Sequence, residues 1–404
     1  MTITNLAKRI KENLTTKDFT AVCFIAYFKL HLSKGMMLKR GISQNEIYKY
    51  INNEENSFNL KSVKNFEAHI RNELNELNNI YGFRFKSMVK SKWDNLGLSV
   101  VEEQLQTNKN GIQNIIEIID KELQPLTIDS IFDLFEELNG SDRGLNDFFT
   151  PESISKFISK IVGTKKFGKN INIFDPTIGM GRLIYHSFME LKERYPNSNI
   201  NIFGIDLNKR FVAISEALLN LVNNQNVFIE EGNTLKNDFG FPQMDICISN
   251  PPYEKGIEYT FVEYVKNLHC KSFLILPNAF TFHKNAEKIR KELMNRGLIK
   301  TIIQLPEKLF KNTNIQTIIV ELDNDPLMKL EKLAIDNKLL FKKIDYSKDV
   351  KTQIKEFEEE VIKKECKENT KREINLLELR NKIANDLEKL SNSIKPILLD
   401  NEAS

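Results

Sequence analysis

The feature that most constrains the fold is an alternation of short β-type runs with helix-type segments between residues 147 and 325. Apolar residues recur at helical spacing in several intervening segments, for example 211–222 and 286–295. Strands that alternate with helices are typical of βαβ units, and they predict an α/β fold with a doubly wound, mostly parallel, seven-stranded sheet. The seven β-type runs occupy residues 171–174, 202–205, 227–229, 245–248, 272–276, 301–305 and 317–322. No clear helix separates the last two runs, which allows an antiparallel final strand.

The segments on either side have the pattern of helices. In residues 1–146 apolar positions recur at steps of three and four, as between 112 and 123, and Pro125 then interrupts the pattern. Residues 326–404 are rich in charge and again show helical spacing. The sequence therefore predicts a helical N-terminal domain over 1–146, a central domain over 147–325 and a helical C-terminal tail over 326–404. The tail is a candidate region for docking a partner.

Composition excludes some classes of protein. The chain has 404 residues, is 41% hydrophobic and carries a net charge of +3, so a wholly disordered chain is excluded, but the charge alone does not indicate a nucleic-acid partner. The four cysteines are scattered and the five histidines show no ligand spacing, so we predict neither a disulfide framework nor a metal site. No run of about 18 apolar residues occurs, so we predict no membrane span and a cytoplasmic location.

Acidic residues follow the first two predicted strands. Asp175 opens the loop Asp-Pro-Thr-Ile-Gly-Met-Gly at 175–181, whose glycines allow close approach of the backbone to a ligand. Asp206 ends the next run, where a carboxylate is placed to bind ribose hydroxyls. The loop is not G-x-G-x-x-G and lacks a P-loop lysine, so a dinucleotide or triphosphate fits less well. An ordinary turn at 175–181 and a helix N-cap at Asp206 are the structural alternatives.

The tetrapeptide Asn250-Pro251-Pro252-Tyr253 follows the fourth predicted strand. Its two prolines fix the backbone and remove two N–H donors, which leaves the Asn side-chain oxygen and backbone carbonyls as rigid acceptors. The tyrosine adds a flat ring for stacking. A planar substrate with an NH2 group suits such a site, because acceptors that hold both hydrogens favour the pyramidal geometry in which the nitrogen becomes nucleophilic.

These segments, in this order, resemble a family of enzymes. Together with Asn146-Asp147-Phe148-Phe149-Thr150-Pro151, they resemble S-adenosylmethionine-dependent DNA adenine-N6 methyltransferases, and more closely the modification subunits of type I restriction–modification systems. Three further segments, 276–280, 303–310 and 312–317, support the closer match. The resemblance covers roughly the middle half of the chain and implies a class I, Rossmann-like methyltransferase fold.

The resemblance also implies roles for individual residues toward S-adenosyl-L-methionine. The segment before the first strand would cover the methionine end of the cofactor, the 175–181 loop would form its main binding loop, and Asp206 would take the ribose hydroxyls. Asn233 stands where the family often has aspartate, and its oxygen would accept from the cofactor's adenine. The implied cofactor-binding residues are Phe149, Thr150, Pro151, Asp175, Thr177, Gly179, Gly181, Asp206 and Asn233.

The implied catalytic set is Asn250, Pro251, Pro252 and Tyr253. Asn250 and the Pro251 carbonyl would hold the target amine, and Tyr253 would stack on an adenine extruded from double-stranded DNA. We see no separate segment that looks like a base-reading domain. This absence and the resemblance imply a specificity subunit as partner and leave a restriction subunit open.

Phosphate contacts are expected from basic residues such as Lys165, Lys166 and Lys169, with a solvated loop as the alternative.

Other functions also stay open. A methyltransferase for ribosomal RNA adenine or for a release-factor glutamine would share the Asn-Pro-Pro-Tyr chemistry, but such families usually lack the Phe149-Thr150-Pro151 segment. An inactive scaffold that binds S-adenosylmethionine is the third reading, motivated by Met180 and Asn233, which depart from the usual family pattern.

Overall fold

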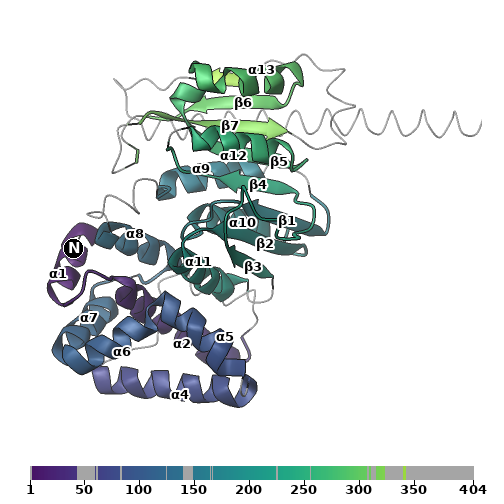
Figure 1. The fold of residues 1–404 in the computed structure, drawn as a ribbon. Coiled ribbons are helices and arrows are strands. Elements are labelled where there is room, and N and C mark those ends of the chain that lie inside the picture. The colour runs from purple at the N-terminus through teal and green to yellow at the C-terminus, as the bar shows by residue number, and fades with distance from the viewer. Residues whose placement is uncertain are drawn as a thin grey trace, which may run out of the picture.

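The computed structural model describes most of the chain up to residue 323 (Figure 1). The described residues are 2–42, 60, 62–81, 84–123, 125–139, 149–163, 165, 167–223, 226–254, 256–306, 309–310, 315–323 and 340–342.

Helices make up the described part of the N-terminal region. They are α1 (Ile3–Glu12), α2 (Thr20–Lys39), α4 (Val63–Tyr81), α5 (Arg84–Leu96), α6 (Leu98–Thr107), α7 (Lys109–Lys121) and α8 (Ile128–Asn139). Among the described residues, α2 is the one helix whose length and hydropathy would suffice to cross a membrane. However, 78% of its apolar window is buried inside the fold, because the other helices pack around it. Such burial is typical of the core helix of a helical domain.

The central region contains the sheet. Its strands are β1 (Asn170–Asp175), β2 (Asn199–Asp206), β3 (Val227–Glu231), β4 (Ile246–Ser249), β5 (Lys271–Pro277), β6 (Ile299–Gln304), β7 (Thr317–Asp323) and β8 (Leu340–Lys342). The strand order is β3-β2-β1-β4-β5-β7-β6-β8. Strands β1 to β5 are parallel to one another, whereas β7 runs antiparallel to both β5 and β6. This confirms the doubly wound, mostly parallel sheet, and β7 is the antiparallel strand that the sequence allowed.

One strand was not expected. β8 pairs with β6 at the edge of the sheet and makes it eight-stranded among the described residues, where the sequence predicted seven strands. It lies within the segment predicted to be a helical tail, so that prediction is wrong for residues 340–342. The remainder of 326–404 lies outside the described residues.

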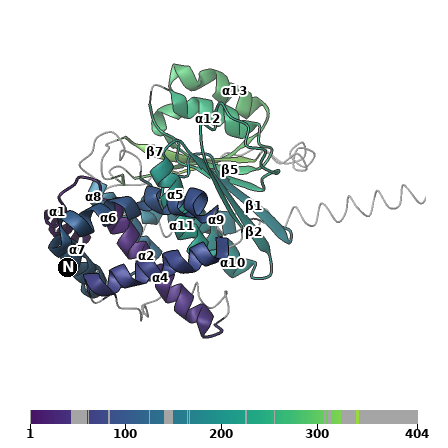
Figure 2. The same ribbon diagram turned by 60° about the horizontal axis from the view of Figure 1, so that its bottom comes forward.

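Helices cover both faces of the sheet (Figure 2). They are α9 (Glu152–Gly163), α10 (Arg182–Arg194) and α11 (Lys209–Val222) on one face and α12 (Ile257–Lys266) and α13 (Glu287–Asn295) on the other. Strand side chains alternate between these layers, so Ile173 packs with the first layer and Phe174 with the second. The first layer shares one continuous core with the N-terminal helices.

The N-terminal helices contact the sheet domain chiefly through α11, which packs against α2 and α5. The buried Lys34 on α2 donates to the carbonyl of Asn220 near the end of α11 at 2.8 Å. Burial lowers the pKa of Lys34 to about 8. Arg210 on α11 forms an ion pair with Asp18 at 2.8 Å. Polar contacts and a shared core therefore hold the helical region against the first layer.

The structure also corrects the prediction for Lys165. Its side chain is 1% exposed, and its Nζ lies 2.7 Å from Oε1 of the buried Glu321 on β7. A lysine held in this way cannot contact DNA phosphates, so the prediction is wrong for Lys165. Lys169 is exposed, and Lys166 lies outside the described residues.

Candidate active site

The loop after β1 is tied to the ends of three strands. Asp175, at the end of β1, accepts from the backbone N–H of Thr177 at 2.8 Å, and the hydroxyl of Thr177 lies 2.7 Å from that of Ser249 on β4. The N–H of Gly179 donates to Asp206 Oδ2 at the end of β2, at 2.9 Å. Because parallel strands bring their carboxyl ends to one edge, these contacts gather the acidic strand ends around a single loop.

Two glycines of this region meet steric demands of the fold. Gly181 has φ +90°, a conformation that favours glycine, at the start of α10. A Cβ on Gly204 would lie 2.4 Å from Cδ1 of Ile178, so β2 and the loop could not pack as they do. The positive φ of Gly181 therefore shapes the turn into α10, the structural role that the sequence left open.

Burial makes this edge unfavourable for negative charge. It raises the pKa of Asp175, which is 1% exposed, to about 7, and the nearby Asp206 contributes to the shift. Burial also raises the pKa of Asp206, although hydrogen bonds from the N–H groups of Asn208 and Gly179 favour its ionised form. Since a cation beside these carboxyls would favour their charged forms, the edge is suited to a positively charged ligand.

Two adjoining cavities open at this edge. The larger has a volume of about 400 Å³, with Asp206 and Asn233 among its polar residues. The smaller, of about 50 Å³, reaches Asp175 and Thr150. Phe149, Thr177, Gly179 and Asn250 line both cavities.

Asn250 follows β4 and is held at both ends of its amide. Its Nδ2 donates to the hydroxyl of Thr150 at 3.1 Å, and its Oδ1 accepts from the hydroxyl of Tyr253 at 2.6 Å. The Tyr253 hydroxyl also lies 3.2 Å from the carbonyl of Ile275 on β5. The side chain of Asn250 is almost fully buried, and that of Tyr253 is half-buried.

Most of the residues proposed from the sequence meet at these cavities. Those that line them are Phe149, Thr150, Asp175, Thr177, Gly179, Asp206, Asn233, Asn250 and Pro252. Those that do not are Pro151, Gly181, Pro251 and Tyr253. Asn233 lines the larger cavity, but its Oδ1 already accepts from the N–H of Leu235 at 3.0 Å.

Sequence reasoning missed the apolar walls of the larger cavity. Leu207 is 71% exposed beside Asp206, and Phe211, Ile257 and Phe261 complete this wall. The sequence signal available for Leu207 was its position, because it is an apolar residue directly after Asp206, the acidic residue that ends β2. For the aromatic and aliphatic residues of α11 and α12, the sequence pattern is equally consistent with a position in the core and a position on the cavity wall.

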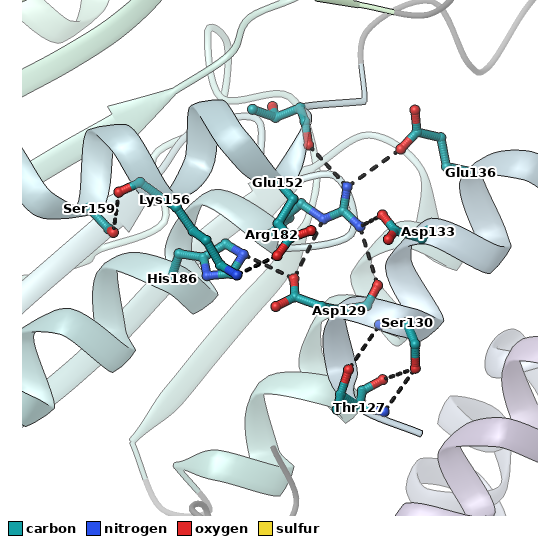
Figure 3. A network of polar contacts seen from close by, with 11 residues as sticks. Thr127, Asp129, Ser130, Asp133, Glu136, Glu152, Lys156, Ser159, Arg182 and His186 are labelled. Atoms are coloured by element: carbon teal, nitrogen blue, oxygen red, sulfur yellow. Dashed lines mark hydrogen bonds and ion pairs between the residues drawn. The ribbon is translucent and has the colours of Figure 1, made fainter. Parts of the chain in front are cut away.

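Sequence reasoning also missed Arg182, the first residue of α10, which lines the smaller cavity. Its side chain is 6% exposed and reaches three carboxylates of α8 (Figure 3). It pairs with Asp133 at short distance, lies 3.4 Å from Glu136 Oε2, and comes within 4.0 Å of Asp129. Arg182 also donates to the carbonyl of Thr150 at 3.4 Å. The N-terminal region is thus connected to the edge that carries Asn250.

Known proteins are similar to this chain in sequence and in fold. The family model described as N-6 DNA methylase matches residues 129–267 and 258–389, together more than half of the chain. A methylase subunit of a type I restriction enzyme from Methanocaldococcus jannaschii is 23% identical over 47% of this chain and 39% of its own length. One from Mycoplasma pneumoniae is 22% identical over 77% of this chain and 66% of its own length. The chain therefore spans less than two thirds of either relative.

Among solved structures, the methyltransferase subunit of a type I restriction–modification system from Streptococcus thermophilus is similar, with a TM-score of 0.58. It is 19% identical, and the match covers 90% of this chain and 92% of the other, a likeness that supports the fold. Because the family model covers both the α8–α10 region with Arg182 and the Asn250 turn, the chain belongs to the N-6 DNA methylase family.

Proposed function

We propose that this chain transfers a methyl group from S-adenosyl-L-methionine to N6 of adenine in double-stranded DNA, as the modification subunit of a type I-like restriction–modification system. The observation that carries this proposal is the position of Asn250. Its amide lies on the wall of the same two cavities that Asp175 and Asp206 line. Asn250, an acceptor for an amine, therefore shares one site with Asp175 and Asp206, which are suited to bind a cationic nucleoside.

The residues at this edge fit S-adenosylmethionine. Asp206 would accept from the ribose hydroxyls, and the apolar wall that includes Leu207 and Phe211 would cover the adenine ring. Asp175, in the smaller cavity, would face the cationic end of the cofactor. When bound, S-adenosylmethionine supplies a methyl group on a positively charged sulfur.

The protein's part in the reaction is to orient the amine. Asn250 Oδ1 is an amide acceptor on the cavity wall that the Tyr253 hydroxyl orients at 2.6 Å, and we propose that it accepts from the target N–H. The rigid turn at Pro251 and Pro252 would place a backbone carbonyl for the second hydrogen. Such fixed acceptors favour the reactive geometry of the nitrogen without reorganising during the transfer.

The target adenine must leave the duplex before it reaches Asn250, which costs a few kcal/mol. Tyr253 is our candidate for stacking on the extruded base, an interaction worth about 1–3 kcal/mol. Its hydroxyl is bonded to Asn250 and Ile275, so we propose that the ring stacks while this hydroxyl stays anchored or exchanges partners.

We further propose that a specificity subunit selects the DNA sequence, and a restriction subunit is a second partner to be tested. The division into a helical domain over 1–146, a catalytic domain over 147–325 and a partner-docking tail over 326–404 stays a prediction. A cytoplasmic location stays a prediction as well.

The test of function is an assay with labelled cofactor. The full chain, alone and with the proposed specificity subunit, is incubated with DNA, ribosomal RNA and release factor in parallel. We expect the label in N6-methyladenine of DNA, identified by nucleoside mass spectrometry. Label only in cytosine, RNA or glutamine would contradict the proposal. Cofactor binding in calorimetry without turnover on any DNA would favour the inactive scaffold.

Cofactor binding is expected to depend on pH through Asp175. Below pH 7 its carboxyl is largely protonated in the free protein, and a cationic ligand favours the ionised form, so binding releases a proton. Affinity for S-adenosylmethionine should therefore rise by up to about tenfold per pH unit between about pH 5 and 7, then level off. Calorimetry across this range measures it, with Asp175→Asn as the control that removes the dependence.

The raised pKa of Asp175 has the opposite effect on folding: a rising pH increases cofactor affinity but lowers the stability of the folded protein. The pKa of Asp175 is about 7 in the folded protein against its ordinary value of 3.8, so the folded state binds more protons between these values. The free protein should lose stability as the pH rises through this window, while its cofactor affinity increases. Equal affinity at about pH 5.5 and 7 would show that Asp175 does not face the cation.

A further inference from the structure

We propose that Thr150 is a positioning residue for Asn250: its hydroxyl anchors the amide that presents an acceptor to the target amine. This inference rests on the proposed function and assigns Thr150 a task other than covering the cofactor. Residues 149–151 precede α9, 100 residues from Asn250 in sequence, so the contact is made by the fold alone.

The amide of Asn250 has two anchors. The Thr150 hydroxyl holds Nδ2 at 3.1 Å, and the Tyr253 hydroxyl holds Oδ1 at 2.6 Å. With both ends held, rotation about the last side-chain torsion is restricted, and the amide plane is fixed before the substrate arrives. Removing the Thr150 anchor would leave a buried N–H without this acceptor and would allow the plane to rotate.

Thr150 is itself held from the opposite side. Its carbonyl accepts from Arg182 at 3.4 Å, and the next residue, Pro151, accepts from the N–H of Ser155 in α9 at 3.0 Å. Arg182 is in turn fixed by the carboxylates of α8 (Figure 3). The position of Asn250 is therefore determined through Thr150 by the sheet-covering helices and by the last helix of the N-terminal region.

Three variants of the full chain test the assignment. Thr150→Val keeps the shape but loses the hydroxyl, Thr150→Ser keeps the hydroxyl, and Thr107→Val is a matched control on the exposed end of α6. We expect Thr150→Val to lower kcat about tenfold, the effect of one lost hydrogen bond in the transition state, with cofactor affinity within about twofold of wild type. Thr150→Ser should keep kcat within about twofold, and Thr107→Val should change neither quantity.

Two kinetic outcomes would overturn the proposal: an unchanged kcat in Thr150→Val, or a loss explained wholly by weaker cofactor binding, which would make Thr150 a cofactor ligand instead. A crystal structure of Thr150→Val supplies a readout that does not need activity. The Asn250 amide should leave its wild-type position, and an amide that stays in place would contradict the inference. Wild-type protein that methylates no DNA would reject the proposed function, while the crystal structure would still decide the role of Thr150.

Discussion

Replacing Asn250 with alanine is expected to lower the rate of methyl transfer to DNA adenine by a factor of about 10²–10³, the usual cost of removing one preorganised group that stabilises a transition state. The change removes Oδ1, the proposed acceptor for the target N–H, and also removes the Asn250 amide as a hydrogen-bond partner of the Thr150 and Tyr253 hydroxyls. Initial rates with labelled S-adenosylmethionine and DNA, in the presence of the specificity subunit, measure the effect on kcat.

Asn267→Ala is the matched control for this variant. Asn267 caps the end of α12, and its amide bonds to the carbonyl of Glu263 on an exposed surface, so its loss should leave the rate within about twofold. Asn250→Asp keeps an acceptor but loses the N–H that reaches Thr150, and it should fall between alanine and wild type. An alanine variant that retains more than about a tenth of the wild-type rate would show that Asn250 does not orient the amine.

The strand-end residues of the candidate site could be predicted from sequence because they follow apolar runs directly. Asp175, Asp206 and Asn250 each end or follow a strand whose pattern is local, and the parallel topology then brings them to one edge. The strand pattern and the general rules of chain connection placed these three residues at one edge, whereas their roles toward a cofactor were implied by the family resemblance.

The supporting contacts could not be predicted because they join residues far apart in the chain. Lys165 looked like part of an exposed basic loop, and its burial depends on Glu321, 156 residues later on the antiparallel β7. Arg182 begins α10, and its partners lie on α8, about 50 residues earlier in the chain. Thr150 and Asn250 each belong to a recognisable segment, but neither segment indicates that their side chains meet.

Arg182→Met is expected to destabilise the folded protein by about 3–5 kcal/mol, as found when one partner of a buried ion pair is removed. Methionine fills part of the space of the arginine stem and keeps an apolar contact with Phe132, whose ring centre lies 5.1 Å from the guanidinium. The carboxylates of Asp133 and Glu136 would then lose their shared cation, and the buried Glu136 would carry most of the cost. Urea unfolding at constant pH measures the change as a lower transition midpoint.

The matched control is Arg210→Met, which removes an arginine that is 49% exposed and pairs with Asp18 at 2.8 Å. Such a pair contributes about 0–1 kcal/mol, so the control should unfold close to wild type. Equal stability of the two variants would mean that the α8 carboxylates are solvated or protonated when Arg182 is absent. If Arg182→Met is strongly destabilised as expected, the buried Arg182 guanidinium joins α8 to the start of α10 together with the contact of His186 with Asp129 at 3.0 Å, and the segment that holds Thr150 depends on the N-terminal helices for its position.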